Sequence, residues 1–353
     1  MMRADLAIPA GFHQSPGGGV AAGRRAPSGL DFRRAAPHSG RMSKDLTPAP
    51  PPSAAVLVYG APSPELVEAG AGALQTSPLV PGSTPLEALA PDSCDRAVIA
   101  APPGTVERRY VQALALRALK PGGELIVLAP KDRGGARLRS ELAGFGCEAE
   151  ETGRRHQRIC RAQRPAAPEG LDAALAAGGL QRPAALDLWS QPGVFSWDRP
   201  DPGTQLLLKH LPPLSGAGAD LGCGVGQIAL SVLASPAVTA LTLVDIDRRA
   251  IDAARRNVAD PRAQIVWGDA RQTPELAGLD FVAMNPPFHD SGMESRALGV
   301  AFVARAAAVL RKGGVLWLVA NRHLPYEESL SRLFTRVAPA REAAGFKVYE
   351  ARK

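Results

Sequence analysis

The chain has 353 residues, of which 45% are hydrophobic and 21% charged, enough for two domains with buried cores. No apolar run reaches the roughly 20 residues of a membrane-spanning helix, so no membrane partner is expected. The net charge is +7, but residues 1–50 contribute seven Lys and Arg against three Asp and Glu, so the remainder is nearly neutral and does not indicate a nucleic-acid partner.

The first fifty residues mix Gly, Pro, Ser, Ala and Arg without periodicity, which predicts a disordered N-terminal extension. This stretch lacks the continuous apolar core of a secretory signal. Met42 is a second candidate start of the natural protein. The cysteines have no metal-site spacing, so we expect a cytoplasmic, reducing compartment without a disulfide framework or a metal. They are Cys94, Cys147, Cys160 and Cys223.

Residues 52–163 repeat a pattern of the second half. Residues 98–103 (VIAAPP) match residues 283–287 (AMNPP) as a strand followed by a Pro-Pro turn. Residues 119–123 (LKPGG) match residues 310–314 (LRKGG) as a helix end, a Gly-Gly turn and a strand start. Similar separations within both pairs predict an ancient duplication.

The first copy lacks residues that carry chemistry in the second. Its strand 56–59 is followed by GAPSPE and not by a Gly-x-Gly turn. Ala101 and Gly104 stand where the second copy has Asn285 and Phe288. We therefore expect a folded but catalytically silent first domain.

A Pro-rich segment predicts a linker over residues 164–185, followed by a second domain over residues 186–353. In that domain, short apolar strands alternate with helical segments, which predicts a doubly wound, Rossmann-like α/β sheet. Functional residues of such a sheet lie at the carboxyl ends of its strands. The predicted strands end near Leu221, Asp245, Asp269, Asn285 and Ala320.

The first of these strands runs into a glycine-rich turn, Asp220-Leu221-Gly222-Cys223-Gly224-Val225-Gly226. Glycines permit a tight turn and close approach of a ligand to the backbone. Dinucleotide enzymes also use a Gly-x-Gly turn, so this element alone does not identify the ligand. Asp220, Gly222, Gly224 and Gly226 are candidate cofactor-binding residues.

Two further strand ends carry acids. Asp245 is placed to accept hydrogen bonds from ribose hydroxyls, and Asp269, followed by Ala270, to accept one from an adenine amino group. An NAD site would need the same ribose acid, yet the three strand ends together favour S-adenosylmethionine (SAM). Asp247 is either part of this site or the cap of the following helix.

The fourth strand ends in Asn285-Pro286-Pro287-Phe288-His289. The Asn285 side-chain oxygen and the Pro286 carbonyl offer two acceptors for the hydrogens of an exocyclic amine, whose nitrogen would then face a methyl donor. Phe288 offers a face on which a flipped base stacks. His289 contacts either the substrate or a local carbonyl.

Taken together, these motifs resemble those of a known family, the small-subunit (16S) ribosomal RNA guanine-N2 methyltransferase C family. The resemblance rests on residues 192–208 (PGVFSWDRPDPGTQLLL), DLGCGVG, NPPFH, residues 319–326 (VANRHLPY) and the closing GFKVYEARK; in the first half it includes KDRGGAR at 131–137. It implies SAM-dependent formation of N2-methylguanosine in small-subunit ribosomal RNA in the cytoplasm, with a silent first domain that aids folding or RNA contact. The sequence does not give the oligomeric state, and a monomer is the expectation. Phe195, Thr204 and Gln205 would close over cofactor or substrate.

Other functions remain open from the residues. A protein glutamine-N5 methyltransferase uses a similar Asn-Pro-Pro-aromatic turn, usually with Tyr where this chain has Phe288. A DNA adenine methyltransferase would add a target-recognition domain. A non-catalytic RNA-binding assembly factor would not need an intact Asn285. Arg296, Arg322 and His323 are candidate phosphate contacts or solvated surface charges.

Overall fold

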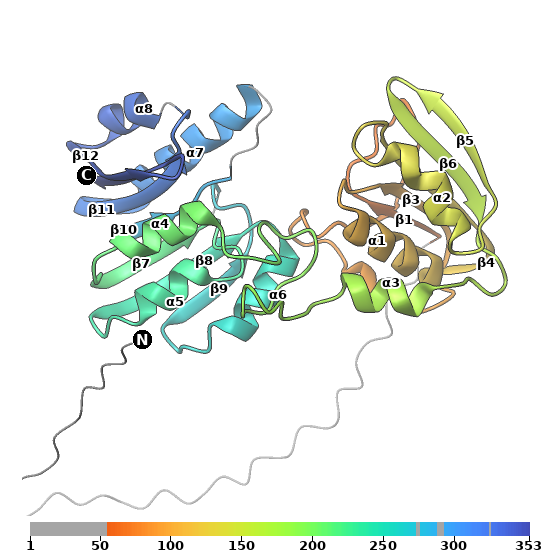
Figure 1. Cartoon of the computed structure of the whole chain (residues 1–353), viewed down its shortest axis with the longest axis horizontal. Helices are drawn as coiled ribbons and strands as arrows, with labels where there is room; N and C mark the ends of the chain where they lie inside the picture. Colours follow the sequence, from red (N-terminus) through yellow and green to blue (C-terminus); the bar gives the residue numbers. More distant parts are fainter. Residues whose placement is uncertain (1–54, 273–275, 288–292, 325) are drawn as a thin grey trace, which may run out of the picture. The chain divides into compact units, whose positions relative to one another are not determined.

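The computed structural model describes residues 55–272, 276–287, 293–324 and 326–353, which form two separate β-sheets (Figure 1). The first sheet has the order β2-β1-β3-β4-β6-β5, with β1 to β4 parallel and β5 and β6 antiparallel. Its strands are β1 (Val56–Tyr59), β2 (Leu74–Gln75), β3 (Cys94–Ala100), β4 (Leu119–Pro130), β5 (Ala149–Arg154) and β6 (Gln157–Gln163).

The helices of the first sheet pack mainly on one face. Their bounds are η1 (Leu86–Ala88), α1 (Thr105–Ala118), η2 (Gly135–Arg137), α2 (Leu138–Ala143) and α3 (Leu171–Gly178). The helix α3 lies within the segment expected as a linker, where Ala174 joins the hydrophobic core under this sheet. An added Cβ on Gly178 would lie 2.3 Å from Tyr110, so α3 packs closely against α1.

The second sheet has the order β12-β13-β11-β10-β7-β8-β9, parallel except at β12 and β13. It confirms the predicted doubly wound sheet. Its strands are β7 (Gly216–Leu221), β8 (Val238–Asp245), β9 (Ala263–Trp267), β10 (Leu279–Met284), β11 (Leu310–Asn321), β12 (Arg336–Ala343) and β13 (Phe346–Arg352). The strand order reverses between β7 and β10, and such a switch point is where open α/β sheets bind ligands.

Helices cover both faces of the second sheet. They are α4 (Pro202–His210), α5 (Gln227–Leu233), α6 (Arg248–Asn257), α7 (Met293–Val309) and α8 (Tyr326–Leu333). Figure 1 shows α4 and α5 along one face of β7 and β8. Side chains of the central strand β10 alternate between two cores: Phe281 packs with α4 and α5, and Val282 with α7 and α8. Burial on both faces explains the continuous apolar run of this strand.

The two sheets share one plan. The first sheet's order corresponds to β8-β7-β10-β11-β13-β12 of the second, and its described residues form no counterpart of β9. The Gly-Gly turns before β4 and β11 agree in detail, since Gly122 and Gly313 have φ values of 78° and 79°. Each glycine donates to the carbonyl of the residue after the last strand, namely Arg164 and Lys353, and these donate back to Gly123 and Gly314. This agreement supports the predicted duplication.

Within the described residues, no helix is long and apolar enough to cross a membrane. No group of His, Cys, Asp or Glu side chains in the same residues is arranged to hold a metal ion.

Candidate active site

The glycine turn lies at the carboxyl end of β7, where Gly222, Gly224 and Gly226 have φ values of 78°, 52° and 90°. Residues other than glycine rarely adopt such a backbone. The Gly222 N–H donates to the Val244 carbonyl at 2.8 Å, which ties the turn to β8. An added Cβ on Gly224 would have no described atom within 4 Å, so the space beside this residue is open to a ligand.

Asp245 lies at the end of the neighbouring strand and holds the turn from the other side. Its carboxylate accepts from the Gly224 N–H at 2.8 Å and from the Asp247 N–H at 2.9 Å. Burial raises the pKa of Asp245 to about 6, although these backbone N–H groups lower it. The acid expected to bind ribose is thus rigidly placed beside the open part of the glycine turn. Asp247 caps α6, accepting from the Arg249 N–H, which confirms the capping interpretation.

Asp220 is fully buried in β7, and neither of its carboxylate oxygens makes a hydrogen bond of normal geometry. Burial raises its pKa to about 8, the nearby Asp245 adds to the increase, and the Ala229 backbone N–H opposes it. An unsatisfied buried carboxyl group costs folding free energy in the free protein. A bound group that donates a hydrogen bond or carries positive charge would remove that cost.

Asn285, at the end of β10, has a defined amide orientation. Its Nδ2 atom donates to the Asp201 carboxylate and to Thr204 Oγ1, each at 2.9 Å. A carboxylate only accepts hydrogen bonds, so the nitrogen must face Asp201. The Asn285 Oδ1 atom is consequently directed elsewhere, and within the described part of the chain it is buried without a hydrogen-bond partner. The structure therefore holds one free acceptor at this strand end.

The glycine turn and Asn285 line a common cavity of about 430 Å³, a volume that includes space open to solvent, whereas Asp220 and Asp245 are not among its lining residues. The lining residues are Phe195, Ser196, Asp201, Thr204, Gly222, Cys223, Gly224, Val225, Gln227, Ile228 and Asn285. The glycine turn and Asn285 therefore meet at one site although 59 residues or more separate them in the sequence. Phe195, which is 59% exposed, contributes apolar surface to the lining of the cavity.

Asp269 lies close after β9 and is engaged by Arg271, whose guanidinium reaches the carboxylate at 2.6 Å. The Arg271 contact lowers the pKa of Asp269, which keeps it charged. Ala270 is buried in the core beside the sheet. Neither residue lines the cavity, so their adenine-binding role stays a prediction.

The structure describes only some of the residues that were expected to bind the substrate. Pro286 is buried in the turn after β10, whereas Phe288 and His289 lie outside the described residues. Gln205 is exposed on α4 and absent from the cavity lining. Thr204, the preceding residue, faces Asn285 directly.

Three more predicted residues lie further along the chain. Arg322 is half-exposed and pairs with Glu342 at 3.7 Å, and His323 is exposed. The side chain of Arg296 is outside the described set. Their phosphate contacts stay predictions.

The sequence reasoning missed Asp201. The residues Asp201-Pro202 are a recognisable helix start, and Asp201 indeed caps α4 by accepting from the Thr204 N–H at 2.7 Å. No local signal shows that the same carboxylate oxygen also receives Asn285, 84 residues away.

The matching position of the first copy is filled by a protein side chain. Arg108 donates to the carbonyls of Pro102 and Pro103, at 3.1 and 2.7 Å, in the turn that corresponds to Pro286-Pro287. The same guanidinium forms a buried ion pair with Glu141 at 2.6 Å. The carbonyl groups of this turn therefore accept hydrogen bonds from the protein's own side chain, as expected of a copy that holds no substrate amine.

Comparisons with known proteins agree with this geometry. A family model described as methyltransferase small domain matches residues 185–350. Ribosomal RNA small subunit methyltransferase C of Shewanella loihica is 33% identical over 249 residues, 69% of this chain and 73% of that protein. The Pseudomonas paraeruginosa protein of the same name is 32% identical over 279 residues, 77% and 84% of the two chains.

A solved structure is also similar over most of the chain. It is a 16S rRNA N2 methyltransferase of T. thermophilus in complex with AdoMet and guanosine, 27% identical, with a TM-score of 0.64. The similarity covers 77% of this chain and 76% of that one.

The strand order, the glycine turn and the acid beside it define a SAM-dependent methyltransferase with a Rossmann-like fold. Given the extent of the similarity, the chain belongs to the ribosomal RNA small subunit methyltransferase C family.

Proposed function

We propose that this protein transfers a methyl group from SAM to the exocyclic N2 amine of a guanine in small-subunit ribosomal RNA. The observation that carries the proposal is the fixed amide of Asn285, a residue that lines the cavity together with the glycine turn and whose buried Oδ1 has no hydrogen-bond partner among the described residues. A relative of this family binds both AdoMet and guanosine in its crystal structure, which supports the assignment of both ligands.

The described residues fit the cofactor. Gly224 leaves open space for a ligand against the backbone, and Asp245 presents a carboxylate beside it for two ribose hydroxyls. A cationic ammonium group would favour the ionised form of Asp220, which has no hydrogen-bond partner of normal geometry. SAM, when bound, supplies an electrophilic methyl group on a sulfonium. Asp269 and Ala270 would complete the site at the adenine end.

The chain's own residues hold the attacking amine. Its nitrogen is a weak nucleophile because the lone pair is delocalised into the base. Asn285 Oδ1 and the Pro286 carbonyl would each accept one amine hydrogen, which favours tetrahedral nitrogen and directs its lone pair at the methyl group. The new N–C bond forms as the C–S bond breaks, and one amine proton leaves to solvent. Preorganised acceptors and alignment supply the catalysis.

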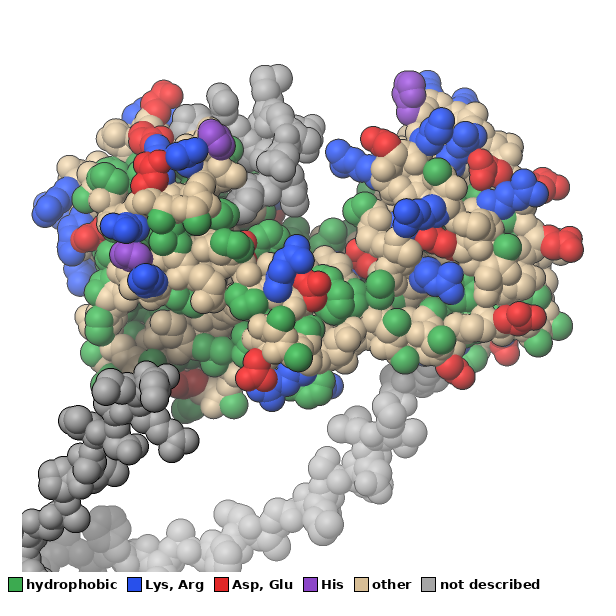
Figure 2. Space-filling model, in the orientation of Figure 1, with side chains coloured by type: hydrophobic (Ala, Val, Ile, Leu, Met, Phe, Trp, Pro, Cys, Tyr) green, Lys and Arg blue, Asp and Glu red, His purple; other side chains and the backbone are tan. Residues whose placement is uncertain are grey.

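Ribosomal RNA also needs a surface that binds phosphates. Lys131, Arg133, Arg137, Arg139 and Arg154 are exposed around α2 and the β5–β6 hairpin of the first sheet. No acidic partner is recorded for any of these five in the described part of the chain. Figure 2 shows basic side chains over this region, interspersed with acidic ones. We therefore place one phosphate-binding surface on the silent copy.

The test is mass mapping of small-subunit rRNA nucleosides from cells with and without the gene. Loss of a single N2-methylguanosine is the expected result. Unchanged rRNA together with loss of a methylated glutamine in a protein would instead identify the glutamine-N5 activity. Unchanged modification of both substrates, with defective subunit assembly, would identify a non-catalytic factor. We further expect the enzyme to be cytoplasmic and monomeric. Native mass spectrometry checks the oligomeric state.

A further inference from the structure

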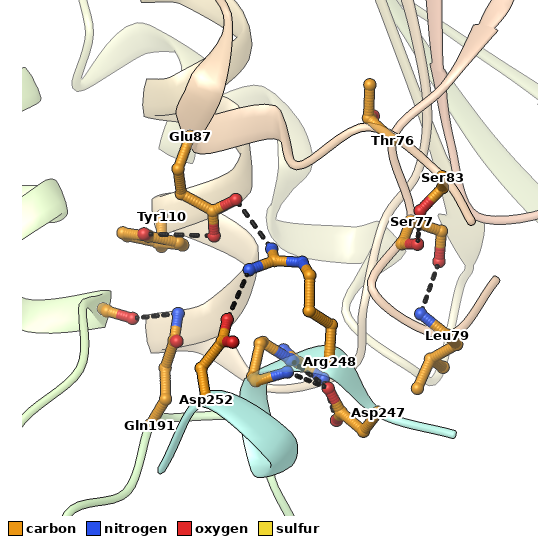
Figure 3. Close-up of polar contacts among 12 residues, drawn as sticks. Thr76, Ser77, Leu79, Ser83, Glu87, Tyr110, Gln191, Asp247, Arg248 and Asp252 are labelled. Atoms are coloured by element: carbon orange, nitrogen blue, oxygen red, sulfur yellow. Dashed lines mark hydrogen bonds and ion pairs between the residues drawn. The ribbon is translucent and has the colours of Figure 1, made fainter. Parts of the chain in front are cut away.

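Two arginines at the start of α6 make ion pairs with glutamates of the first sheet's helices. Arg248 pairs with Glu87 of η1 at 2.7 Å and with Asp252 of its own helix at 2.9 Å (Figure 3). The Arg248 backbone N–H also donates to the Pro78 carbonyl at 3.0 Å. The next residue, Arg249, pairs with Glu107 of α1 at 2.5 Å.

The second pair is the more deeply buried. Arg249 is 5% exposed and Glu107 is 8% exposed. Arg249 also makes a bidentate contact with the Asp247 carboxylate, in which its Nε donates to Oδ1 at 3.0 Å and its Nη2 donates to Oδ2 at 2.8 Å. Burial raises the pKa of Glu107, while the adjacent Arg249 opposes that increase. A buried charge of this kind is tolerated only while its partners remain in place.

A third segment meets the same two side chains. Gly193 has a φ of 101°, and an added Cβ there would lie 2.3 Å from the Glu107 carboxyl carbon and 2.4 Å from Arg249 Nη1. Its carbonyl accepts from Arg249 Nη2 at 3.5 Å. Gly193 lies two residues before Phe195, which lines the cavity. The Glu107–Arg249 pair therefore contacts both the start of α6 and the segment whose residues Phe195 and Ser196 line the cavity.

Hydrogen bonds connect this pair to the acid beside the glycine turn. Glu107 holds Arg249, Arg249 holds the Asp247 carboxylate, and the Asp247 N–H donates to Asp245 Oδ1 at 2.9 Å. We propose that Glu107, a residue of the degenerate copy, is a positioning residue for SAM binding at Asp245. This inference rests on the proposed function, because it assumes that Asp245 binds the cofactor. The silent copy thus completes the cofactor site of the other sheet.

Glu87 provides a matched control. It is also a glutamate of the first sheet's helices, and it also pairs with an arginine of α6. Its partner Arg248, however, makes no recorded side-chain bond to Asp247 or Asp245; its second partner is Asp252. Loss of the Glu87 pair removes a Glu–Arg ion pair to the same helix, although a less buried one, without loosening the route to Asp245.

The experiment compares SAM binding by calorimetry in the full-length parent, Glu107→Ala, Glu107→Gln and Glu87→Ala. We expect Glu107→Ala to raise the Kd by about 10-fold, equivalent to roughly 1.4 kcal/mol. Glu107→Gln keeps an acceptor for Arg249 and should recover most of this loss, whereas Glu87→Ala should stay within about twofold. In steady-state methylation, Glu107→Ala should raise the KM for SAM and leave kcat unchanged.

Parent protein that fails to bind SAM would overturn the proposed function itself. Parent that binds, with Glu107→Ala equally tight, would overturn only this inference, as would equal weakening by both alanine variants. If Glu107→Ala does not fold, hydrogen exchange of the parent decides. SAM binding should then slow exchange in the first turn of α1, because coupling between the two sites is reciprocal. Unchanged exchange there would refute the coupling.

Discussion

Replacing Asn285 by alanine removes the free acceptor that carries the proposed reaction. In the free enzyme, Asn285 Nδ2 makes two hydrogen bonds while Oδ1 is buried without one. The substitution therefore has opposing effects on stability. The bond to the Asp201 carboxylate, worth about 1.5–3 kcal/mol, and the bond to Thr204, worth about 0.5–1.5 kcal/mol, are lost, and the penalty of one unsatisfied buried oxygen, about 1–3 kcal/mol, disappears.

The net change in stability should consequently be small, between a gain of about 1 kcal/mol and a loss of about 3.5 kcal/mol from these terms. The effect on turnover should be larger. Loss of one preorganised polar partner of a reacting group lowers kcat by roughly 10²–10³-fold. The SAM affinity should change little, because Asp245, the acid proposed to bind ribose, and the glycine turn remain.

The assay measures kcat from radiolabelled SAM with purified small subunits or their RNA, and the SAM Kd by calorimetry. A matched control is Asn257→Ala, since the Asn257 side chain makes three hydrogen bonds to the backbone of Trp189 and Val225. That variant should lower the melting temperature but leave kcat within about threefold. Parental kcat in Asn285→Ala would refute the amine-holding role, and loss of SAM binding would reassign Asn285 to the cofactor site.

Three further outcomes are expected. Asp220→Asn should stabilise the free protein at pH 7 by about 1–3 kcal/mol. Raising the pKa of Asp220 from the usual 3.8 to about 8 on folding costs the parent about 4 kcal/mol of folding free energy at this pH, and the buried amide of the variant carries a smaller penalty for its own missing hydrogen bonds. The folded parent holds this proton while the unfolded chain releases it, so parental stability should fall from pH 4 to pH 8 and fall less in the variant; identical thermal-melt profiles would contradict this. Asp245→Ala should raise the SAM Kd by at least about 10-fold in calorimetry, and an unchanged value would reassign that acid. Combined Lys131→Ala, Arg133→Ala and Arg137→Ala should weaken RNA binding and reduce its salt dependence by up to about three counterions, while kcat at saturating RNA stays parental; an unchanged salt slope would exclude this surface.

The doubly wound sheet and its site edge could be predicted because their signals are local. Each apolar strand can be recognised in the sequence together with the residue that ends it: the glycine turn, Asp245 or Asn285. Parallel strands bring their carboxyl ends to one edge of the sheet, so these residues were expected to lie together. The duplication could also be predicted from the sequence, since the Pro-Pro and Gly-Gly turns have similar separations in both halves of the chain. The helix α3 was missed because its Ala- and Gly-rich segment follows a Pro-rich stretch typical of a linker.

The sequence by itself determined the glycine turn at a strand end and predicted an amine methyltransferase with a candidate acceptor pair, because each of these depends on residue types within one short segment. Only the tertiary structure decided how these groups are oriented and satisfied. Asp201 sets the Asn285 amide across 84 residues, Arg108 fills the turn of the silent copy, and Glu107 reaches Arg249 across 142 residues. Such contacts depend on how separate elements pack, and the amino-acid pattern around either partner does not encode them.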